Sequence, residues 1–164
     1  MVRIAIGSDE VGDELRVAIE SFLHRQKAVK VDVVEYEAPG PQPVDAPDVA
    51  VLVAEAVASG DADRGILLCG SGVGMTITAN KVPGVRAAQC HDVYTAEHAR
   101  NSNDAQILVM GSRVVGKELA TQIVAAWLKA EFESSPRRMA KMAKIDSIEK
   151  RFLARKHGRG KAGR

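Results

Sequence analysis

Apolar runs and amphipathic segments alternate along the whole chain. Short runs rich in β-branched and other apolar residues predict strands at 2–6, 31–36, 65–69, 85–90 and 105–111. Apolar residues at helical spacing predict a helix carrying Leu15, Ile19 and Leu23, then helices over 47–59, up to about Asn80, over 92–101 and over 115–131. This alternation is typical of an α/β fold, in which helices connect the strands of a parallel sheet.

The most apolar runs also predict where the helices lie. Residues 65–69 and 106–110 are almost continuously apolar, which is typical of parallel strands buried on both faces. Right-handed crossovers then produce a three-layer α/β/α sandwich around a five-stranded parallel sheet. After a linker at 133–136, the segment from 137 to about 155 predicts an extra C-terminal helix, packed across the body or onto a partner.

Composition and charge limit where the protein can be located in the cell and what it can bind. The 164 residues are 46% apolar, but no apolar run approaches the roughly 18–20 residues of a membrane helix, and the N-terminus turns polar too early for a signal peptide. We expect a cytoplasmic protein with two free thiols and no membrane partner. Residues 150–164 hold seven Lys and Arg and no acidic residue, so residues 1–149 are acidic despite a net charge of +2.

Such a basic end can touch nucleic acid or a membrane surface. Three glycines and a single aromatic residue favour a solvated end instead. We therefore expect one domain over 1–149, a basic, frayed tail over 150–164 and no nucleic-acid partner.

Three polar loops directly follow predicted strands, at 7–10, 69–74 and 111–113. In such sheets, ligands bind outside the carboxyl ends of the strands. The loop Cys-Gly-Ser-Gly-Val-Gly at 69–74 lacks the Lys of a nucleotide-binding phosphate loop and the acidic partner of a dinucleotide site. Its backbone N–H groups, at the start of a helix, can bind a phosphate or a developing oxyanion.

A cysteine stands at the mouth of this loop. Beside backbone donors and a positive helix end, Cys69 is expected to act as a thiolate. It can then remove a proton from a carbon next to a carbonyl while the loop holds the enediolate. The alternative is that Cys69 is a small apolar residue at a strand end, which is our interpretation of Cys90.

Four longer segments are IAIGSDEVGDELR, GILLCGSGVGMTITANKVPGVRAAQCHDVYTAEHAR, NDAQILVMGSRVVGKELA and IVAAWLKAEFE. Together they resemble the ribose-5-phosphate isomerase B / galactose-6-phosphate isomerase family, over residues 2 to about 145. The resemblance implies a Rossmann-like fold and aldose–ketose interconversion of a small phosphorylated sugar through a cis-enediol, without metal or organic cofactor. It also implies homodimers with shared active sites, or tetramers built from them.

The resemblance assigns roles to individual residues. Cys69 corresponds to the proton-abstracting base, and Asp9 and Asn103 correspond to residues that bind the sugar. The loop that stabilises the enediolate corresponds to Gly70, Ser71, Gly72, Val73 and Gly74, with Ser71 where Thr is usual.

Three cations resemble phosphate ligands of the family. Arg113 matches an arginine that reaches in from the partner subunit. Arg137 and Lys141 lie four residues apart, which places them on one face of the C-terminal helix.

Two further positions depart from the family's usual pattern. Glu10 follows Asp9 where a histidine is usual, and we count it among the substrate-binding residues. Ser102 stands where the family has the histidine that opens a furanose ring, and an unactivated hydroxyl is a poor substitute. His91, after the fourth strand, is the candidate for a relocated acid.

The missing histidine favours a substrate that needs no ring opening. The C4 oxygen of a tetrose 4-phosphate carries the phosphate, so this sugar cannot close into a furanose. Residues 102–104, Ser-Asn-Asp, also resemble the family's D-erythrulose-4-phosphate isomerase branch. We expect that D-erythrulose 4-phosphate and D-erythrose 4-phosphate are interconverted. The alternatives are a ribose 5-phosphate isomerase and a non-catalytic sugar-phosphate-binding paralogue.

Other chemistries find little support in the sequence. A redox or nucleotide-binding domain is disfavoured because the chain has no Cys-x-x-Cys and no dinucleotide fingerprint. The histidines are His24, His91, His98 and His157, and their spacing does not predict a metal site.

Overall fold

The computed structural model describes residues 1–40 and 43–159. In this part of the chain, a five-stranded parallel sheet has the strand order β2-β1-β3-β5-β4. The strands are β1 (Val2–Ser8), β2 (Val31–Glu35), β3 (Arg64–Cys69), β4 (Ala87–Gln89) and β5 (Ile107–Gly111).

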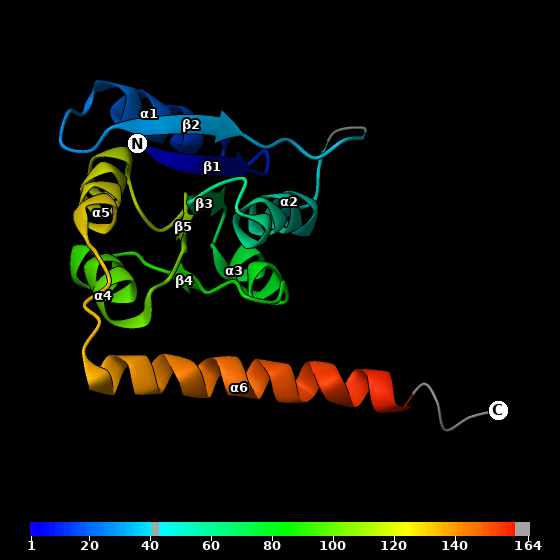
Figure 1. The fold of residues 1–164 in the computed structure, drawn as a ribbon. Coiled ribbons are helices and arrows are strands. Elements are labelled where there is room, and N and C mark those ends of the chain that lie inside the picture. The colour runs from blue at the N-terminus through cyan, green and yellow to red at the C-terminus, as the bar shows by residue number, and fades with distance from the viewer. Residues whose placement is uncertain (41–42, 160–164) are drawn as a thin grey trace. The chain divides into compact units, whose positions relative to one another are not determined.

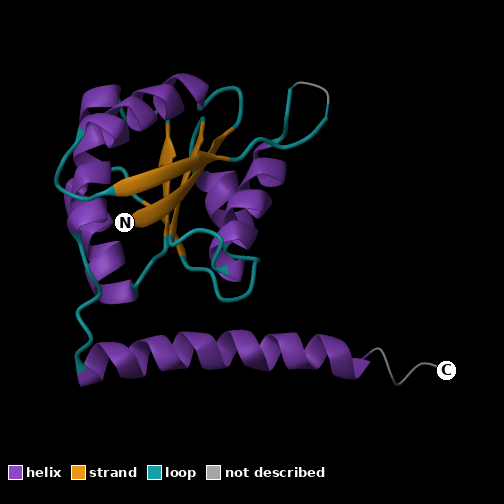
Figure 2. Cartoon of the chain, turned by 45° about the horizontal axis from the view of Figure 1, so that its top comes forward, coloured by secondary structure: helices purple, strands orange, loops and turns teal. Residues whose placement is uncertain are grey.

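Helices cover both faces of this sheet. They are α1 (Asp13–Arg25), α2 (Ala46–Ser59), α3 (Val73–Ala79), α4 (Val93–Asn103) and α5 (Lys117–Lys129). Figure 1 shows α1, α4 and α5 on one side of the strands and α2 and α3 on the other, and Figure 2 shows the same three layers from a second direction. The predicted three-layer α/β/α sandwich is confirmed.

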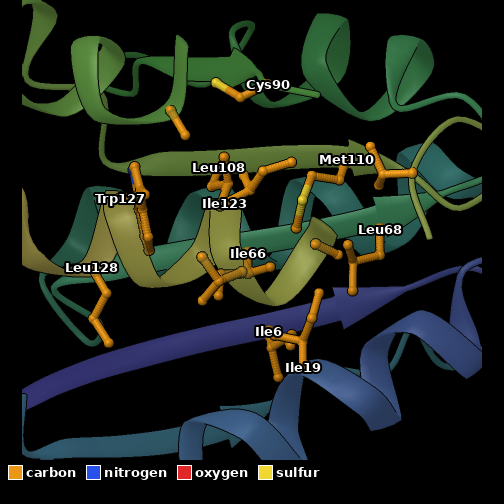
Figure 3. Close-up of a cluster of buried hydrophobic side chains, with 14 of the residues drawn as sticks. Ile6, Ile19, Ile66, Leu68, Cys90, Leu108, Met110, Ile123, Trp127 and Leu128 are labelled. Atoms are coloured by element: carbon orange, nitrogen blue, oxygen red, sulfur yellow. The ribbon is translucent and has the colours of Figure 1, made fainter. Parts of the chain in front are cut away.

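The alternation of side chains along the central strands builds a core on each face. Ile66 and Leu68 of β3 pack with α1, α4 and α5, around the fully buried Trp127 (Figure 3). Leu67 and Cys69 point to the opposite face and pack with α2 and α3. Every residue of β3 is buried, as its continuous apolar run predicts.

The edge strand β4 is shorter than its predicted span of 85–90. The N–H of Arg86 donates to the side-chain oxygen of Gln106 at 2.9 Å. On β4 itself, the Asn80 amide pairs with both the N–H and the carbonyl of Ala87, at 3.0 and 2.8 Å. Side chains thus supply part of the pairing at this edge of the sheet.

The strand pairing decides which loops meet. Ser8 of β1 is paired with Leu68 of β3, and Cys69 of β3 is paired with Gly111 of β5. The loops that leave β1, β3 and β5 therefore lie next to one another at the carboxyl edge. Since α1 and α3 leave neighbouring strands toward opposite faces, a crevice opens between them, which is where α/β folds bind ligands.

The chain divides into two compact units, residues 1–132 and 133–164. The second holds the predicted extra helix, α6 (Pro136–Arg159). Ser135, just before the helix, accepts two N–H groups of its first turn: its carbonyl accepts from Met139 at 2.9 Å and its hydroxyl from Arg138 at 3.3 Å. The helix extends past its predicted end near 155 and takes in residues 150–159, for which the sequence predicted a frayed tail. Lys, Arg, Leu and Ala there are good helix formers, and the first glycine comes only at 158. Residues 160–164 lie outside the described part.

No helix of the described residues is both long enough and apolar enough to cross a membrane.

Candidate active site

A pocket of about 410 Å³ opens at the carboxyl edge of the sheet. It is lined by Asp9, Val11, Ala46, Cys69, Gly70, Ser71, Gly74, Arg113 and Val114. The three loops predicted from the sequence thus meet around one cavity. A thiol, a carboxylate, a glycine loop and a guanidinium come together there from a single chain.

Cys69 ends β3 and is 4% exposed. The N–H of Gly72 donates to its sulfur at 3.1 Å. A backbone donor aimed at the sulfur stabilises negative charge on it. The sulfur thus lies at the wall of the pocket with a backbone donor aimed at it.

The backbone of the glycine loop creates this arrangement. Gly72 has φ 82°, a left-handed conformation that favours glycine and turns the chain into α3. A Cβ at Gly74 would meet nothing within 4 Å, so the loop is open toward the pocket here. The N–H of Val73 donates to the hydroxyl oxygen of Ser71 at 3.3 Å, which leaves the Ser71 proton available to a ligand.

The β1 loop contributes the carboxylate. Oδ1 of Asp9 accepts the Gly12 N–H at 2.9 Å, and the Asp9 N–H donates to the Leu68 carbonyl at 3.2 Å. A Cβ at Gly12 would lie 2.3 Å from that same carbonyl oxygen, so the loop is pressed against β3. Glu10 is exposed and lines a neighbouring acidic cavity with Arg16, not the pocket of Cys69.

Arg113 lies in the pocket of its own chain. Its N–H donates to the Gly70 carbonyl at 3.0 Å, and its Nε lies 3.6 Å from the position of a Cβ on Gly70. Within one chain Arg113 thus lies beside Cys69, and the prediction that it reaches in from a partner subunit stays a prediction. β3 and β5 are neighbours, and their pairing at Cys69 and Gly111 brings the two loops together within one chain.

Asn103 and Ser102 lie at the other edge of the sheet. They end α4, whose 11 residues carry the chain about 16 Å away from the carboxyl edge. The Asn103 carbonyl accepts from Nε of Arg86 at 3.2 Å, just before the start of β4. A single chain therefore does not bring Asn103 to Cys69.

Arg137 and Lys141 belong to the second unit of the chain. Both are exposed on α6, one helical turn apart. Their predicted role as phosphate ligands stays a prediction.

Two further side chains bond the backbone of the pocket's loops from the side away from the cavity. The sequence did not predict this role for either of them. Nε2 of Gln89 donates to the Ser71 carbonyl at 2.7 Å. Nε2 of His91 accepts the N–H of Gly111 at 2.9 Å. Since Nε2 is used as the acceptor of this bond, the geometry argues against His91 as a proton donor to a ligand through Nε2. Both side chains lie at the end of β4. Their contacts could have been predicted only from the strand order, which places β4 beside β5.

Among residues 1–40 and 43–159, no three His, Cys, Asp or Glu side chains come close enough together to hold a metal ion.

Comparison with known proteins agrees with this geometry. The sequence pattern of the family described as Ribose/Galactose Isomerase matches residues 4–145. A D-erythrulose-4-phosphate isomerase of Pectobacterium atrosepticum is 51% identical over 133 residues, 81% of this chain and 86% of the relative. A ribose-5-P isomerase B of Listeria innocua is 43% identical over 92% of this chain and 99% of its own.

A solved structure of Clostridium thermocellum ribose-5-phosphate isomerase B superposes with a TM-score of 0.85. It is 47% identical, and the match covers 92% of this chain and 99% of that one. With this fold and this site, the protein is an enzyme, a sugar-phosphate isomerase that interconverts an aldose and a ketose. The chain belongs to the ribose/galactose isomerase family.

Proposed function

We propose that this isomerase interconverts D-erythrulose 4-phosphate and D-erythrose 4-phosphate, with Cys69 as the base. The observation that carries the choice of substrate is the burial of Ser102, which is 3% exposed in its own chain. A hydroxyl held there is poorly placed to protonate a ring oxygen. A tetrose 4-phosphate arrives as an open chain and needs no such proton. The similarity to a relative named D-erythrulose-4-phosphate isomerase supports the same choice.

The reaction is derived from the thiol and its loop. The Cys69 thiolate removes a proton from C2 of the aldose, the electron pair forms the C1–C2 double bond, and the carbonyl oxygen becomes an enediolate oxygen. Backbone N–H groups of residues 70–74 stabilise that oxygen. The Ser71 hydroxyl passes a proton between the two oxygens, and the thiol returns its proton to C1, which yields the ketose.

Charge orients the substrate in the pocket. Arg113 supplies the guanidinium for the phosphate, because the other charged group of the lining is the carboxylate of Asp9. Asp9 has an oxygen left for sugar hydroxyls after accepting the Gly12 N–H through Oδ1. Arg137 and Lys141 are the further phosphate ligands in this proposal.

A second copy of the chain completes the site. Asn103 is needed near the sugar carbonyl but lies across the sheet from Cys69 in its own chain, so we place a homodimer with shared sites in the proposal. Co-expression of Cys69→Ala with Asn103→Ala chains tests it. Hybrid dimers then hold one intact site, and we expect about a quarter of wild-type activity from random pairing.

The matched control pairs Cys69→Ala with Arg113→Ala. Both residues serve the same pocket in one chain in this proposal, so each site of the hybrid lacks one of them. At a substrate concentration near the wild-type KM, we expect no activity above that of the Arg113→Ala chains alone. Recovery in this control and none with Asn103→Ala would contradict the arrangement.

The substrate is tested by comparing kcat/KM for D-erythrulose 4-phosphate and ribose 5-phosphate. We expect the higher value for the tetrulose phosphate. Ribose 5-phosphate is the second candidate, because several similar proteins are named for it. An equal or higher value for ribose 5-phosphate would overturn our choice. A cytoplasmic location and the independence of any cofactor stay predictions.

A further inference from the structure

The carboxyl end of the edge strand β4 reaches both loops of the pocket. Gln89 is its last residue and donates to the Ser71 carbonyl at 2.7 Å. His91 comes two residues later and accepts the Gly111 N–H at 2.9 Å. One side chain therefore holds the loop after Cys69, and the other holds the loop that carries Arg113.

These two loops touch each other through their backbones. A Cβ at Gly111 would lie 2.6 Å from the carbonyl carbon and oxygen of Ser71. A Cβ at Gly72 would lie 3.2 Å from Nε2 of Gln89. Such close packing leaves no space for one loop to shift without the other, so the two bonds from β4 set where both loops lie.

The two side chains do not themselves line the pocket formed by the three loops. They are half-buried on the outer side of the loops, and their polar atoms are used on backbone groups. Their influence on a substrate must therefore pass through Ser71, Gly111 and the residues directly after each.

We propose that Gln89 and His91 are positioning residues. They hold the enediolate loop, residues 70–74, and the phosphate loop, residues 111–113, in a fixed position relative to each other. The proposal rests on the proposed function, in which residues 70–74 stabilise the enediolate and Arg113 binds the phosphate. One substrate must meet both groups at once, and a displacement of about 1 Å can reduce the rate up to about 10²-fold. His91 acts here as an acceptor through Nε2, and Gln89 acts as a donor.

The two hydrogen bonds hold loops with different roles, one in the transition state and one in substrate binding. The variants are therefore expected to change different kinetic constants. Gln89→Met keeps the length of the side chain but removes the donor, and we expect a fall of about tenfold in kcat because the enediolate loop acts in the transition state. His91→Leu removes the acceptor beside Arg113, and we expect about a tenfold rise in KM with a smaller change in kcat. His91→Gln places an amide oxygen where Nε2 lies and is expected to restore KM.

Matched controls are available on the same chain. Gln106→Met removes a glutamine that bonds the Gly84 carbonyl and the Arg86 N–H at the opposite edge. His98→Leu removes a histidine that stacks on Tyr94 of α4. We expect kcat and KM within about twofold of wild type for both. Equal effects of the controls and of the β4 variants would overturn the proposal.

Amide hydrogen exchange tests the positioning independently of turnover. We expect the Gly111 amide to exchange faster in His91→Leu and the amides of 70–74 to exchange faster in Gln89→Met, each at least about tenfold. Unchanged exchange at both loops would overturn the positioning role, even if the enzyme works. Changed exchange in a protein that turns over neither sugar phosphate would contradict the proposed function alone.

Discussion

The two cysteines show how little burial says about chemistry. Both lie at the carboxyl ends of parallel strands, and Cys69 and Cys90 are 4% and 0% exposed. Cys90 points into the core formed with α1, α4 and α5 (Figure 3), where burial and the nearby charge of Asp92 raise the pKa of its thiol to about 12. Cys69 points to the other face, where its sulfur meets a backbone N–H and the wall of a pocket.

The difference arises from the residues that come after each strand. After β3 comes Gly72, whose left-handed backbone turns an N–H toward the sulfur. After β4 comes Asp92, whose carboxylate accepts the Thr95 N–H at 2.7 Å to cap α4 and adds a negative charge near Cys90. One sulfur therefore accepts a backbone N–H at the wall of a pocket, and the other thiol has surroundings that disfavour its ionised form.

The largest expected effect is on catalysis. Cys69→Ala removes the proposed base, and we expect kcat to fall by at least about 10²–10⁴ without unfolding. Cys90→Ala is the matched control, and we expect it to retain activity and lose about 1–2 kcal/mol of unfolding free energy to the cavity. Steady-state kinetics and urea unfolding measure both variants. Activity of Cys69→Ala within tenfold of wild type would show that another group is the base.

The rate of alkylation distinguishes the reactivity of the two thiols in the unmutated protein. At pH 8, a thiol with a pKa of about 12 is ionised in only about one molecule in 10⁴, and the thiolate is the reacting form. We expect iodoacetamide to label one cysteine per folded chain, Cys69, in step with the loss of activity, and the substrate to slow it. Mass spectrometry of the digested protein identifies the site. Label on Cys90 at an equal rate would remove the contrast between the two environments.

A smaller effect is expected at the cation beside Cys69. Arg113→Ala removes the proposed phosphate ligand, and we expect KM to rise about 10- to 100-fold with kcat changed less, because a remote phosphate is held alike in ground and transition states. Arg3→Ala, which breaks an exposed ion pair with Asp32, is the control. An unchanged KM in Arg113→Ala would place the phosphate elsewhere.

The sequence allowed much of this to be predicted, because the strongest signals are local. The apolar run at 65–69 and the glycines after it predict a buried strand that ends in a loop. The position of polar loops after strands then predicts that Asp9, Cys69 and Arg113 share an edge. The geometry of parallel sheets makes this step independent of the order of the strands.

The contacts that the sequence did not predict depend on that order. Only the pairing of β3 with β5 explains why Arg113 lines the same pocket as Cys69 within one chain. Only the place of β4 at the edge, beside β5, explains why Gln89 and His91 reach the loops. These contacts join residues 18 and 20 positions apart through backbone acceptors and donors, which no residue pattern marks.

The smallest expected effect concerns stability at high pH. It tests whether the surroundings of Cys90 keep its thiol protonated in the folded state. In the unfolded chain this thiol ionises near its ordinary pKa of 9.0, whereas in the fold it holds its proton up to about 12. Between these values the unfolded state has lost a proton that the folded state keeps. The free energy of unfolding therefore falls as pH rises, by at most about 1.4 kcal/mol per pH unit, and below pH 9 the contribution is fully present.

Cys90→Ala lacks this titration, so its unfolding free energy is expected to fall less steeply than that of the wild type between pH 9 and about 11. Urea unfolding of both proteins at intervals of half a pH unit measures the difference, and the lysines and tyrosines common to both cancel in it. We expect the advantage of the wild type to shrink by about 1 kcal/mol per unit. Parallel curves would mean that Cys90 ionises alike in the folded and unfolded chains, and that its surroundings differ less from those of Cys69 than the structure indicates.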